Sequence, residues 1–292
     1  MTDCADRLLL DRIEGYCDLV PRTDTVTHEV GAFTLFVSRG GPGSYDYYAR
    51  PRLGLDRPVT AADVTAVLER QVELGVPRAL EWVDETTPSL LSVAEASGLV
   101  VQRCPLLVLV GAPVASAVQV ELQAELQVER QVERQAERQA EIRVMGADDP
   151  DLPGVHATVS VGFAHPGTAI GAAGLPERDA AVEAGVDGAR RSSKQVAEGD
   201  SVVVGALVEG RGAVGGGTHR PRGDTTEVVG VGVLPAYRRR GVAGAVTAAL
   251  SHQALEAGVT TVFCGAEDEA VARVYERVGF RRVGTACLGR VE

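Results

Sequence analysis

A repeated four-residue unit near the middle of the chain limits most strongly what the rest can fold into. Residues 119–141 read QVEL, QAEL, QVER, QVER, QAER and QAE, and these residue types favour helices. Four residues advance a helix by about 400°, so each unit is rotated about 40° from the one before and the apolar residues spread around the surface. We therefore predict an exposed helical linker over 113–141 that separates two domains, 1–112 and 142–292.

Two other interpretations of this repeat stay open. It would serve as a coiled coil or as a helix that binds a partner, although it lacks the apolar seam that a coiled coil needs. Its first part, residues 118–126, alternates apolar and polar residues, as a half-buried strand does.

The two predicted domains share one order of elements, in which helices end at glycine and are followed by strands. The first has a helix over 60–74, a strand over 79–83, a helix from Thr87 and Pro88, and a strand over 100–109. The second has a helix over 242–257, a strand over 260–264, a helix over 268–278 and a strand over 281–288. This repetition predicts two copies of one α/β unit, although the same rhythm is common in α/β proteins.

Local signals support several of these elements. Thr60 and Asp63 have the spacing of a capping box, and Thr87 followed by Pro88 is typical of a helix start. Glycine-rich turns separate further strands. These are a hairpin of 33–37 with 45–49, and successive strands over 201–208, 213–218 and 227–233, with turns at 210–212 and 221–224.

Charge and composition exclude several classes of function. The formal net charge of −11 argues against nucleic-acid and anionic-membrane partners, which need a basic surface. No apolar run reaches the roughly 20 residues of a membrane span, and the first residues lack the basic region of a signal peptide. The five cysteines are scattered without metal-binding spacing, so we expect a cytoplasmic protein without a metal.

A turn rich in arginine and glycine joins the strand over 227–233 to the helix over 242–257. Pro235 ends the strand, because proline cannot donate to a sheet. The first N–H groups of the helix lack helical partners and carry the positive end of the dipole, so a phosphate fits there. The arginines of this segment would supply cationic donors to the phosphate, and its small residues would let the phosphate approach the backbone closely. The segment consists of Arg238, Arg239, Arg240, Gly241, Val242, Ala243 and Gly244. Taken alone, these residues fit a solvated tight turn equally well.

A second segment, residues 268–280, predicts an amphipathic helix with an apolar face. Val271, Val274, Tyr275 and Val278 share that face. Taken alone, this spacing indicates that Tyr275 is a core residue.

Together the two segments resemble the GNAT superfamily of acetyl-CoA-dependent N-acetyltransferases, over residues 142–292. The R-x-x-G-x-A pattern is formed by Arg238, Gly241 and Ala243, and the later Y-x-x-x-G-F pattern by Tyr275, Gly279 and Phe280. Relatives often carry Asn seven residues before that Tyr, where this chain has Asp268. The resemblance implies an α/β (α+β) fold of two GNAT-like domains, each a mixed, mostly antiparallel twisted sheet flanked by helices.

The resemblance also implies where acetyl-CoA binds. Its pyrophosphate would lie on backbone N–H groups from about Arg239 to Gly244. Its pantetheine would run beside the strand from Val231 to Val233, and the Val233 N–H would polarise the acetyl carbonyl.

The resemblance implies direct transfer of the acetyl group to a small-molecule or peptide amine. Tyr275 would protonate the departing thiolate, and Glu227 would accept the proton of the amine. Glu227 is expected on one strand face with Val229, Val231 and Val233; an ordinary carboxylate at a strand start is the alternative. His219 is a substrate contact, an alternative base or, as we favour, a residue of a surface turn.

The first domain resembles a degenerate second copy of the same fold. Ala94 stands where the second copy has Tyr275, and Arg57-Pro58-Val59 precedes the helix in place of R-x-x-G-x-A, so we expect no second cofactor site. Residues 81–85, Glu-Trp-Val-Asp-Glu, fit either an acidic pocket for a cationic amine or, as we favour, a core Trp82 flanked by solvated acids. For the whole chain, the alternative to an enzyme is a non-catalytic acyl-CoA sensor or scaffold, which would not need Tyr275.

Overall fold

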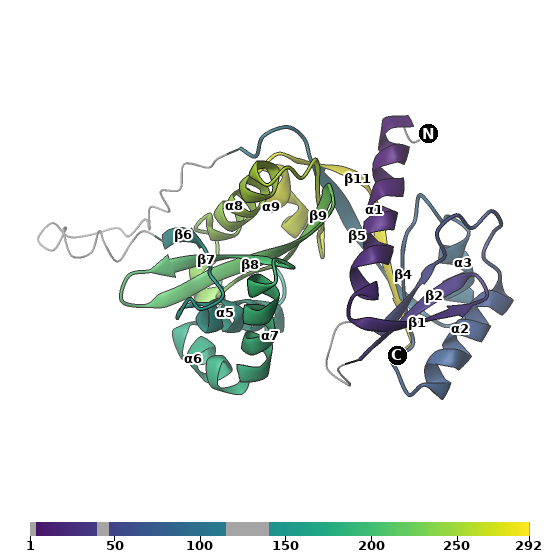
Figure 1. Ribbon diagram of the computed structural model, residues 1–292, viewed down its shortest axis with the longest axis horizontal. Helices are drawn as coiled ribbons and strands as arrows, with labels where there is room; N and C mark the ends of the chain where they lie inside the picture. The colour runs from purple at the N-terminus through teal and green to yellow at the C-terminus, as the bar shows by residue number, and fades with distance from the viewer. Residues whose placement is uncertain (1–3, 40–46, 115–139, 292) are drawn as a thin grey trace, which may run out of the picture. The chain divides into compact units, whose positions relative to one another are not determined.

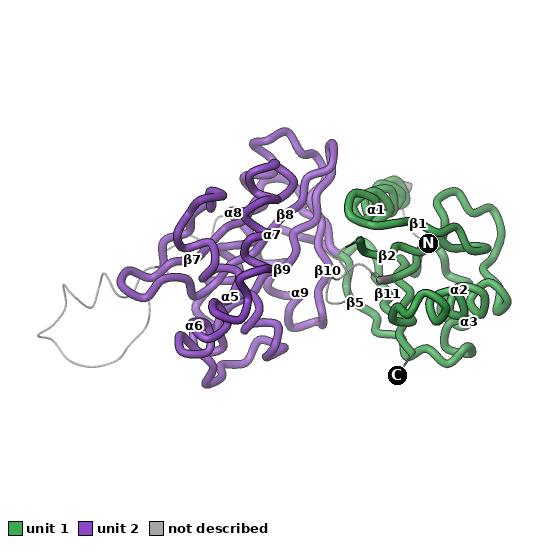
Figure 2. The backbone as a smooth tube through the Cα atoms, turned by 60° about the horizontal axis from the view of Figure 1, so that its bottom comes forward, with its two compact units in different colours: residues 1–106, 282–292 green, residues 107–281 purple. Residues whose placement is uncertain are grey.

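The computed structural model describes residues 4–39, 47–114 and 140–291. The chain divides into two compact units, Met1–Leu106 with Arg282–Glu292 and Leu107–Arg281 (Figure 2). This division differs from the predicted domains, because the end of the chain belongs to the first unit rather than to the second. Most of the repeated segment lies outside the described residues, and its end, Ala140 and Glu141, is the start of a strand.

The strands of unit 1 follow the order β1-β2-β3-β4-β11 in the sheet and are mostly antiparallel. β3 and β4 are parallel neighbours, whereas β1–β2, β2–β3 and β4–β11 are antiparallel. The elements are α1 (Cys4–Arg22), β1 (Thr25–Val30), β2 (Phe33–Ser38), β3 (Tyr47–Pro51), α2 (Ala61–Glu73), β4 (Ala79–Val83), α3 (Leu90–Ala96), β5 (Val100–Leu109) and β11 (Phe280–Arg290). β5 and β11 each run from one unit into the other.

The strands of unit 2 follow the order β5-β10-β9-β8-β7-β6 in the sheet, in which β10 and β9 are parallel and β9 to β6 are antiparallel. The elements are β6 (Ala140–Val144), α5 (Leu152–Ala164), α6 (Leu175–Ala184), α7 (Val186–Ala197), β7 (Val202–Val208), β8 (Gly212–Arg222), β9 (Thr225–Val233), a 3-10 turn η1 (Pro235–Tyr237), α8 (Val242–Glu256), β10 (Thr261–Gly265) and α9 (Glu269–Glu276). The predicted fold class, a mixed and mostly antiparallel sheet flanked by helices, is confirmed.

The capping box before α2 is confirmed, and the start of α3 is corrected. Thr60 Oγ1 accepts from the Asp63 N–H at 3.3 Å, and an Asp63 carboxylate oxygen accepts from the Thr60 N–H at 3.0 Å. α3 begins at Leu90 and not at Thr87, because the N–H groups of Thr86 and Thr87 both donate to Val83 O and make a turn of this stretch. The sequence patterns described above do not predict α1, β1 or the helices α5 to α7.

The last strand of each repeat ends in the other unit. β5 follows α3, yet its residues from Leu107 onward belong to unit 2, where β5 is the neighbour of β10. β11 follows α9, yet it pairs with β4 in unit 1, from Ala286 opposite Val83 to Arg290 opposite Ala79. β5 and β11 therefore each begin in one unit and end in the other, which no local pattern in the sequence indicates.

Three consecutive glycines on β8 allow helices to pack closely on both faces of the unit 2 sheet. A methyl group on Gly215 would lie 2.5 Å from Val242 of α8, and one on Gly217 would lie 3.0 Å from Leu250 of the same helix. A methyl group on Gly216 would instead lie 2.4 Å from Val155 of α5. Because side chains alternate along a strand, α8 and α5 cover opposite faces (Figure 1).

Candidate active site

The cofactor strand predicted from the sequence, β9, is paired with its neighbour β10 only over its first three residues. Their parallel register covers only Thr225 to Glu227 on β9, opposite Thr261 to Phe263 on β10. β9 continues to Val233, so its last residues present a backbone edge that β10 does not pair with in the described register. Such an edge offers N–H and C=O groups to an extended ligand.

A β-bulge interrupts β9 at the point where it leaves β10. Gly216 of β8 faces Gly232, but Thr218 faces Val229, so Gly217 alone opposes two residues of β9. The first of them, Gly230, has a φ of +62°, a conformation that glycine adopts at low cost. A glycine inside a predicted strand is a known signal for a bulge, and we did not read it from the sequence.

The bulge changes which face the side chains of β9 occupy. Directly opposite residues share a face, and His219, which bonds α8, lies opposite Val228. Glu227 therefore lies on the α5 face. Beyond the bulge, Val231 contacts the position of Gly217, on the α8 face. The expectation that Glu227, Val229, Val231 and Val233 share one face was therefore wrong, because the extra residue inverts the alternation.

The N–H group of Val233 points toward the open edge of β9. The next N–H, that of Leu234, donates to Val214 O of β8 at 3.0 Å. Backbone groups of consecutive strand residues point to opposite sides, so those of Val233 point away from β8. Its carbonyl accepts from Arg238 Nε at 3.4 Å.

The turn before α8 has the backbone shape of an anion-binding loop. Arg239 has a φ of +64° and Gly241 a φ of +79°, both in the left-handed region. A non-glycine residue in that region is uncommon and concentrates at functional loops. Gly241 is the N-cap of α8 and supplies no side-chain cap, so the first N–H groups of α8 and the positive end of its dipole face the turn.

The side chain of Arg238 does not lie at the rim of this turn, where the sequence had placed it. Its guanidinium donates to the carbonyl oxygens of Gly162 at 3.0 Å, Ala169 at 3.3 Å and His165, in addition to that of Val233. Burial lowers the pKa of Arg238, and the nearby Glu267 partly opposes this shift. Arg238 thus ties the end of α5 to the cofactor strand.

The other two arginines remain at the surface of the turn. Arg239 and Arg240 are exposed, and the Arg240 guanidinium lies 5.1 Å from the centre of the Tyr237 ring. Val242 is buried against β8, whereas Ala243 and Gly244 are half-buried at the start of α8. The cationic rim therefore consists of Arg239 and Arg240.

Tyr275 lies in the core of unit 2, within the electrostatic reach of Glu227. It is 7% exposed and packs in one cluster with Val242 and Val246 of α8, and its ring centre is 5.9 Å from that of Phe280. Burial raises the pKa of Tyr275, and the nearby Cys264 and Glu227 raise it further. Burial also raises the pKa of Cys264. The phenol therefore keeps its proton at neutral pH.

Asp268 has a structural position at the start of α9. Its carboxylate accepts from the N–H groups of Ala270 and Val271, both at 2.8 Å. Asp268 is thus the N-cap of the helix that carries Tyr275, and this cap fixes where that helix begins.

His219 is a core residue and not a residue of a surface turn. Its side chain is fully buried on β8, which continues to Arg222 beyond the turn predicted at Pro221. One ring nitrogen lies 3.0 Å from Thr226 Oγ1 and the other 2.6 Å from Gln253 Oε1. The amide oxygen accepts, so the ring fits as a neutral imidazole that donates to Gln253, and burial lowers its pKa.

In unit 1, acidic side chains bind the helix N-terminus and the strand backbone that correspond to the uncapped start of α8 and the open edge of β9 in unit 2. The Asp63 carboxylate lies at the N-terminus of α2 and accepts from both terminal nitrogens of Arg57 at 2.7 Å, in addition to the capping bonds. Between the parallel strands β3 and β4, Glu14 of α1 accepts from Arg50 at 2.9 Å and from the Val83 N–H at 3.3 Å.

The residues of the Glu81 to Glu85 stretch are built into unit 1. Trp82 is 1% exposed, Glu81 is 3.3 Å from Arg50, and Glu85 accepts from the Thr285 N–H at 2.8 Å. The favoured interpretation of Trp82 as a core residue agrees with this burial. The neighbouring acids are engaged in bonds rather than freely solvated.

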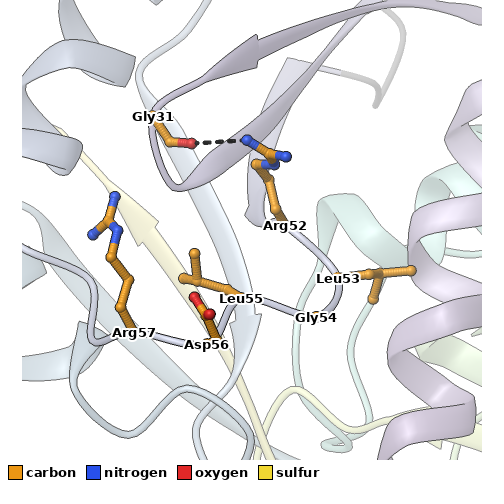
Figure 3. A pocket seen from close by; sticks show the side chains of 7 residues that line it. All are labelled: Gly31, Arg52, Leu53, Gly54, Leu55, Asp56 and Arg57. Carbon is orange, nitrogen blue, oxygen red and sulfur yellow. Dashed lines mark hydrogen bonds between the residues drawn. The ribbon is translucent and has the colours of Figure 1, made fainter.

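Two hollows in the described part of the chain lie away from β9. One, of about 250 Å³, is lined by Gly31 and residues 52–57 of unit 1, where Arg52 donates to Gly31 O at 3.5 Å (Figure 3). The other, of about 830 Å³, lies along β6 and the β7–β8 turn. Neither contains a predicted site residue.

Among the described residues, no cluster of three or more histidines, cysteines or acids is arranged to hold a metal ion. In the same part of the chain, no helix combines the length and the apolar character needed to cross a membrane.

Comparison with known families identifies the domain that carries this site. Residues 174–280 match the model of the acetyltransferase (GNAT) family, a range that contains β9, the turn, α8 and Tyr275. The chain therefore carries a GNAT-family domain, and acyl transfer is the chemistry of this family. No curated protein matches the chain significantly in sequence.

Solved structures share the fold over nearly the whole chain. A GCN5-related N-acetyltransferase from Kribbella flavida is 19% identical, with a TM-score of 0.65 over 97% of this chain and 96% of its own. A conserved protein of unknown function from Staphylococcus epidermidis is 13% identical, with a TM-score of 0.53 over 95% and 97%. A tandem GNAT protein from the clavulanic acid biosynthesis pathway is 15% identical, with a TM-score of 0.52 over 89% and 78%.

The burial of His219 predicts a loss of stability in acid. Its pKa is lower in the folded chain than the value of about 6.5 in the unfolded chain, so the unfolded chain takes up the proton first as pH falls. The folded state therefore has its full stability above about pH 7, where His219 is neutral in both states, and the free energy of unfolding decreases below about pH 6.5. We expect the urea midpoint to fall between pH 7.5 and 5.5, and to fall less in His219→Gln. A parallel fall in both proteins would contradict this, since His156, whose pKa is also lowered by burial, would then explain all of it.

Proposed function

We propose that this chain is an N-acetyltransferase that moves the acetyl group of acetyl-CoA directly to a primary amine. The active copy lies within 142–292, and the first copy, 1–112, binds no cofactor. The observation that carries the proposal is the unpaired edge of β9 beside an N-terminus of α8 that no side chain caps. An extended ligand with a phosphate at one end fits both features together.

The proposed path of acetyl-CoA follows from these two features. The pyrophosphate lies on backbone N–H groups from Arg239 to Gly244, with Arg239 and Arg240 as cationic partners. The pantetheine amides pair with the open edge of β9 at Val231. The acetyl carbonyl then reaches the Val233 N–H, which points to that edge.

The proposed reaction uses groups on the two faces of the sheet. The amine nitrogen bonds to the acetyl carbon, the carbon–sulfur bond breaks, and the proton of the amine goes to Glu227 on the α5 face. Tyr275, which packs with α8 on the other face, gives its proton to the sulfur. Burial raises the pKa of the phenol, so Tyr275 holds its proton until the departing thiolate accepts it.

The internal bonds of unit 1 support a single cofactor site per chain. Asp63 fills the N-terminus of α2 with a carboxylate, where α8 would hold a phosphate. Glu14 bridges Arg50 and the Val83 backbone, where β9 leaves its edge open. An incoming CoA would have to displace both groups. The scattered cysteines, four of which form no disulfide in the described part of the chain, support a cytoplasmic location.

The first experiment combines calorimetry of CoA binding with thiol release from acetyl-CoA in the presence of a panel of amines. We expect one CoA per chain and thiol release that depends on the amine. CoA binding without turnover on any amine would favour a non-catalytic acyl-CoA sensor. The absence of CoA binding would refute the proposal.

Gly241→Val is expected to weaken CoA binding by about 10- to 100-fold, because it costs one or more charge-assisted hydrogen bonds to phosphate. The matched control is Gly258→Val at the other end of α8, where φ is +88° against +79° and no neighbour lies within 4 Å of the added Cβ in either case. Calorimetry compares the two, since both carry the same backbone strain. Equal CoA affinity in both variants would refute the phosphate site.

Tyr275→Phe is expected to lower kcat by about 100- to 10,000-fold, the usual contribution of a general acid. The dissociation constant of acetyl-CoA should stay within about twofold, because the ring and its packing remain. Tyr237→Phe, which also removes one phenol hydroxyl but beside Arg240, is the control and should keep its kcat. A normal kcat in Tyr275→Phe would end the assignment of Tyr275 as proton donor.

A further inference from the structure

One row of side chains on α5 crosses the unit 2 sheet and ends over the open edge of β9. Val155 lies against the glycine positions of β7 and β8, since a methyl group on Gly205 or Gly216 would come within 2.7 Å or 2.4 Å of it. One turn later, Val159 lies over β9, where its backbone is 2.8 Å from the position of a Cβ on Gly232. Residues four apart on a helix are neighbours, so the row advances about one strand per turn.

The next residue in this row is Phe163. Beyond Glu227, β9 has no β10 partner in the described register, and Phe163 follows Val159 by one turn, next to Gly162, whose added Cβ would lie 3.1 Å from Val233 N. Its exposure agrees with this position: Phe163 is 54% exposed, whereas the other four phenylalanines are at most 4% exposed. A large aromatic side chain is thus held at the open edge, close to Val233.

Arg238 holds the backbone on both sides of Phe163. It donates to the carbonyl oxygens of Gly162 and His165, which flank this residue. The loop that follows is joined to η1 by two backbone bonds, from the Gly171 N–H to Pro235 O and from the Ala236 N–H to Ala173 O. The end of α5 is therefore fixed before any ligand binds, which reduces the cost of ordering it.

We propose that Phe163 determines acceptor specificity, and that the acceptor carries an aromatic or alkyl group next to its primary amine. This inference depends on the proposed acetyl transfer. Phe163 lies on the α5 face, as Glu227 does, whereas the phosphate turn leads into α8 on the opposite face. The acceptor must approach the thioester from the side that CoA does not fill, and this is the side of Phe163.

The exposed positions that follow Phe163 are mostly apolar, with His165 as the polar exception. Ile170, in the same loop, is 67% exposed. The cation of Arg238 is engaged by four carbonyl oxygens, and His165 Nδ1 lies 3.0 Å from Val161 O. An apolar group of the acceptor would therefore cover Phe163 without leaving a charge of the protein unpaired. A second ammonium group of the acceptor would instead lose its hydration at this position.

The test compares amines that differ in the group next to the amine. Phenethylamine and hexylamine are measured against ethanolamine and putrescine, with saturating acetyl-CoA and thiol release as the readout. We expect wild-type kcat/KM to favour the apolar pair. Phe163→Ala should lower that preference by about 10- to 100-fold, the value of an apolar side-chain contact, and Phe163→Leu should keep most of it. Val144→Ala on β6, which is 50% exposed three strands from β9, is the control.

The outcomes separate this inference from the proposed function. If acetyl-CoA does not bind, the proposed function fails. If turnover occurs but favours the polar amines, or if Phe163→Ala leaves the preference unchanged, the specificity role of Phe163 is refuted. A weaker acetyl-CoA affinity with the amine preference unchanged would place Phe163 on the cofactor and overturn the inference. If no amine is acetylated, calorimetry measures the binding of phenethylamine to the CoA-loaded protein. The inference requires that phenethylamine binds to the wild type and binds more weakly to Phe163→Ala, and it is refuted otherwise.

Discussion

The unpaired edge of β9 is the constraint around which unit 2 is arranged. Backbone N–H and C=O groups away from water need partners, and a sheet normally supplies them from the next strand. Here β10 pairs with only three residues of β9, and the bulge at Gly230 turns the strand before its last residues. The glycines of β8 and β9 then let α5 and α8 approach the backbone on both faces. Arg238 closes one end of the arrangement through carbonyl oxygens alone.

The two repeats solve the same backbone problem in opposite ways. In unit 1, the helix start at Thr60 has its own carboxylate, and α1 places Glu14 across two parallel strands. In unit 2, the corresponding positions hold glycine and an exposed turn, which leaves their hydrogen-bonding capacity for a ligand. Under the proposed function, a few acidic side chains on a shared fold would distinguish the copy that binds acetyl-CoA from the copy that does not.

The sequence predicted the parts of this molecule that depend on local chemistry. The capping box of Thr60, the strand Ala79–Val83 and the start of α8 at Val242 follow from residue types at fixed spacing. The face of Val231 relative to Glu227, the burial of His219 and the direction of the Arg238 side chain depend instead on long-range packing. The periodicity of a strand does not show that a bulge inverts the faces of the residues beyond it. The sequence around Arg238 is the same whether its guanidinium binds a phosphate or four carbonyl oxygens, so the direction of this side chain cannot be predicted from it.

The exchange of β5 and β11 has a consequence for how such a gene can change. The first repeat has the closed copy's chemistry, yet it contributes the strand next to β10, while the end of the second repeat completes the sheet of the first. A deletion that removed either half would leave the other with a missing strand and an uncovered edge. Neither half of the sequence therefore contains every strand of the sheet that it helps to form, so the two halves are expected to be inherited together.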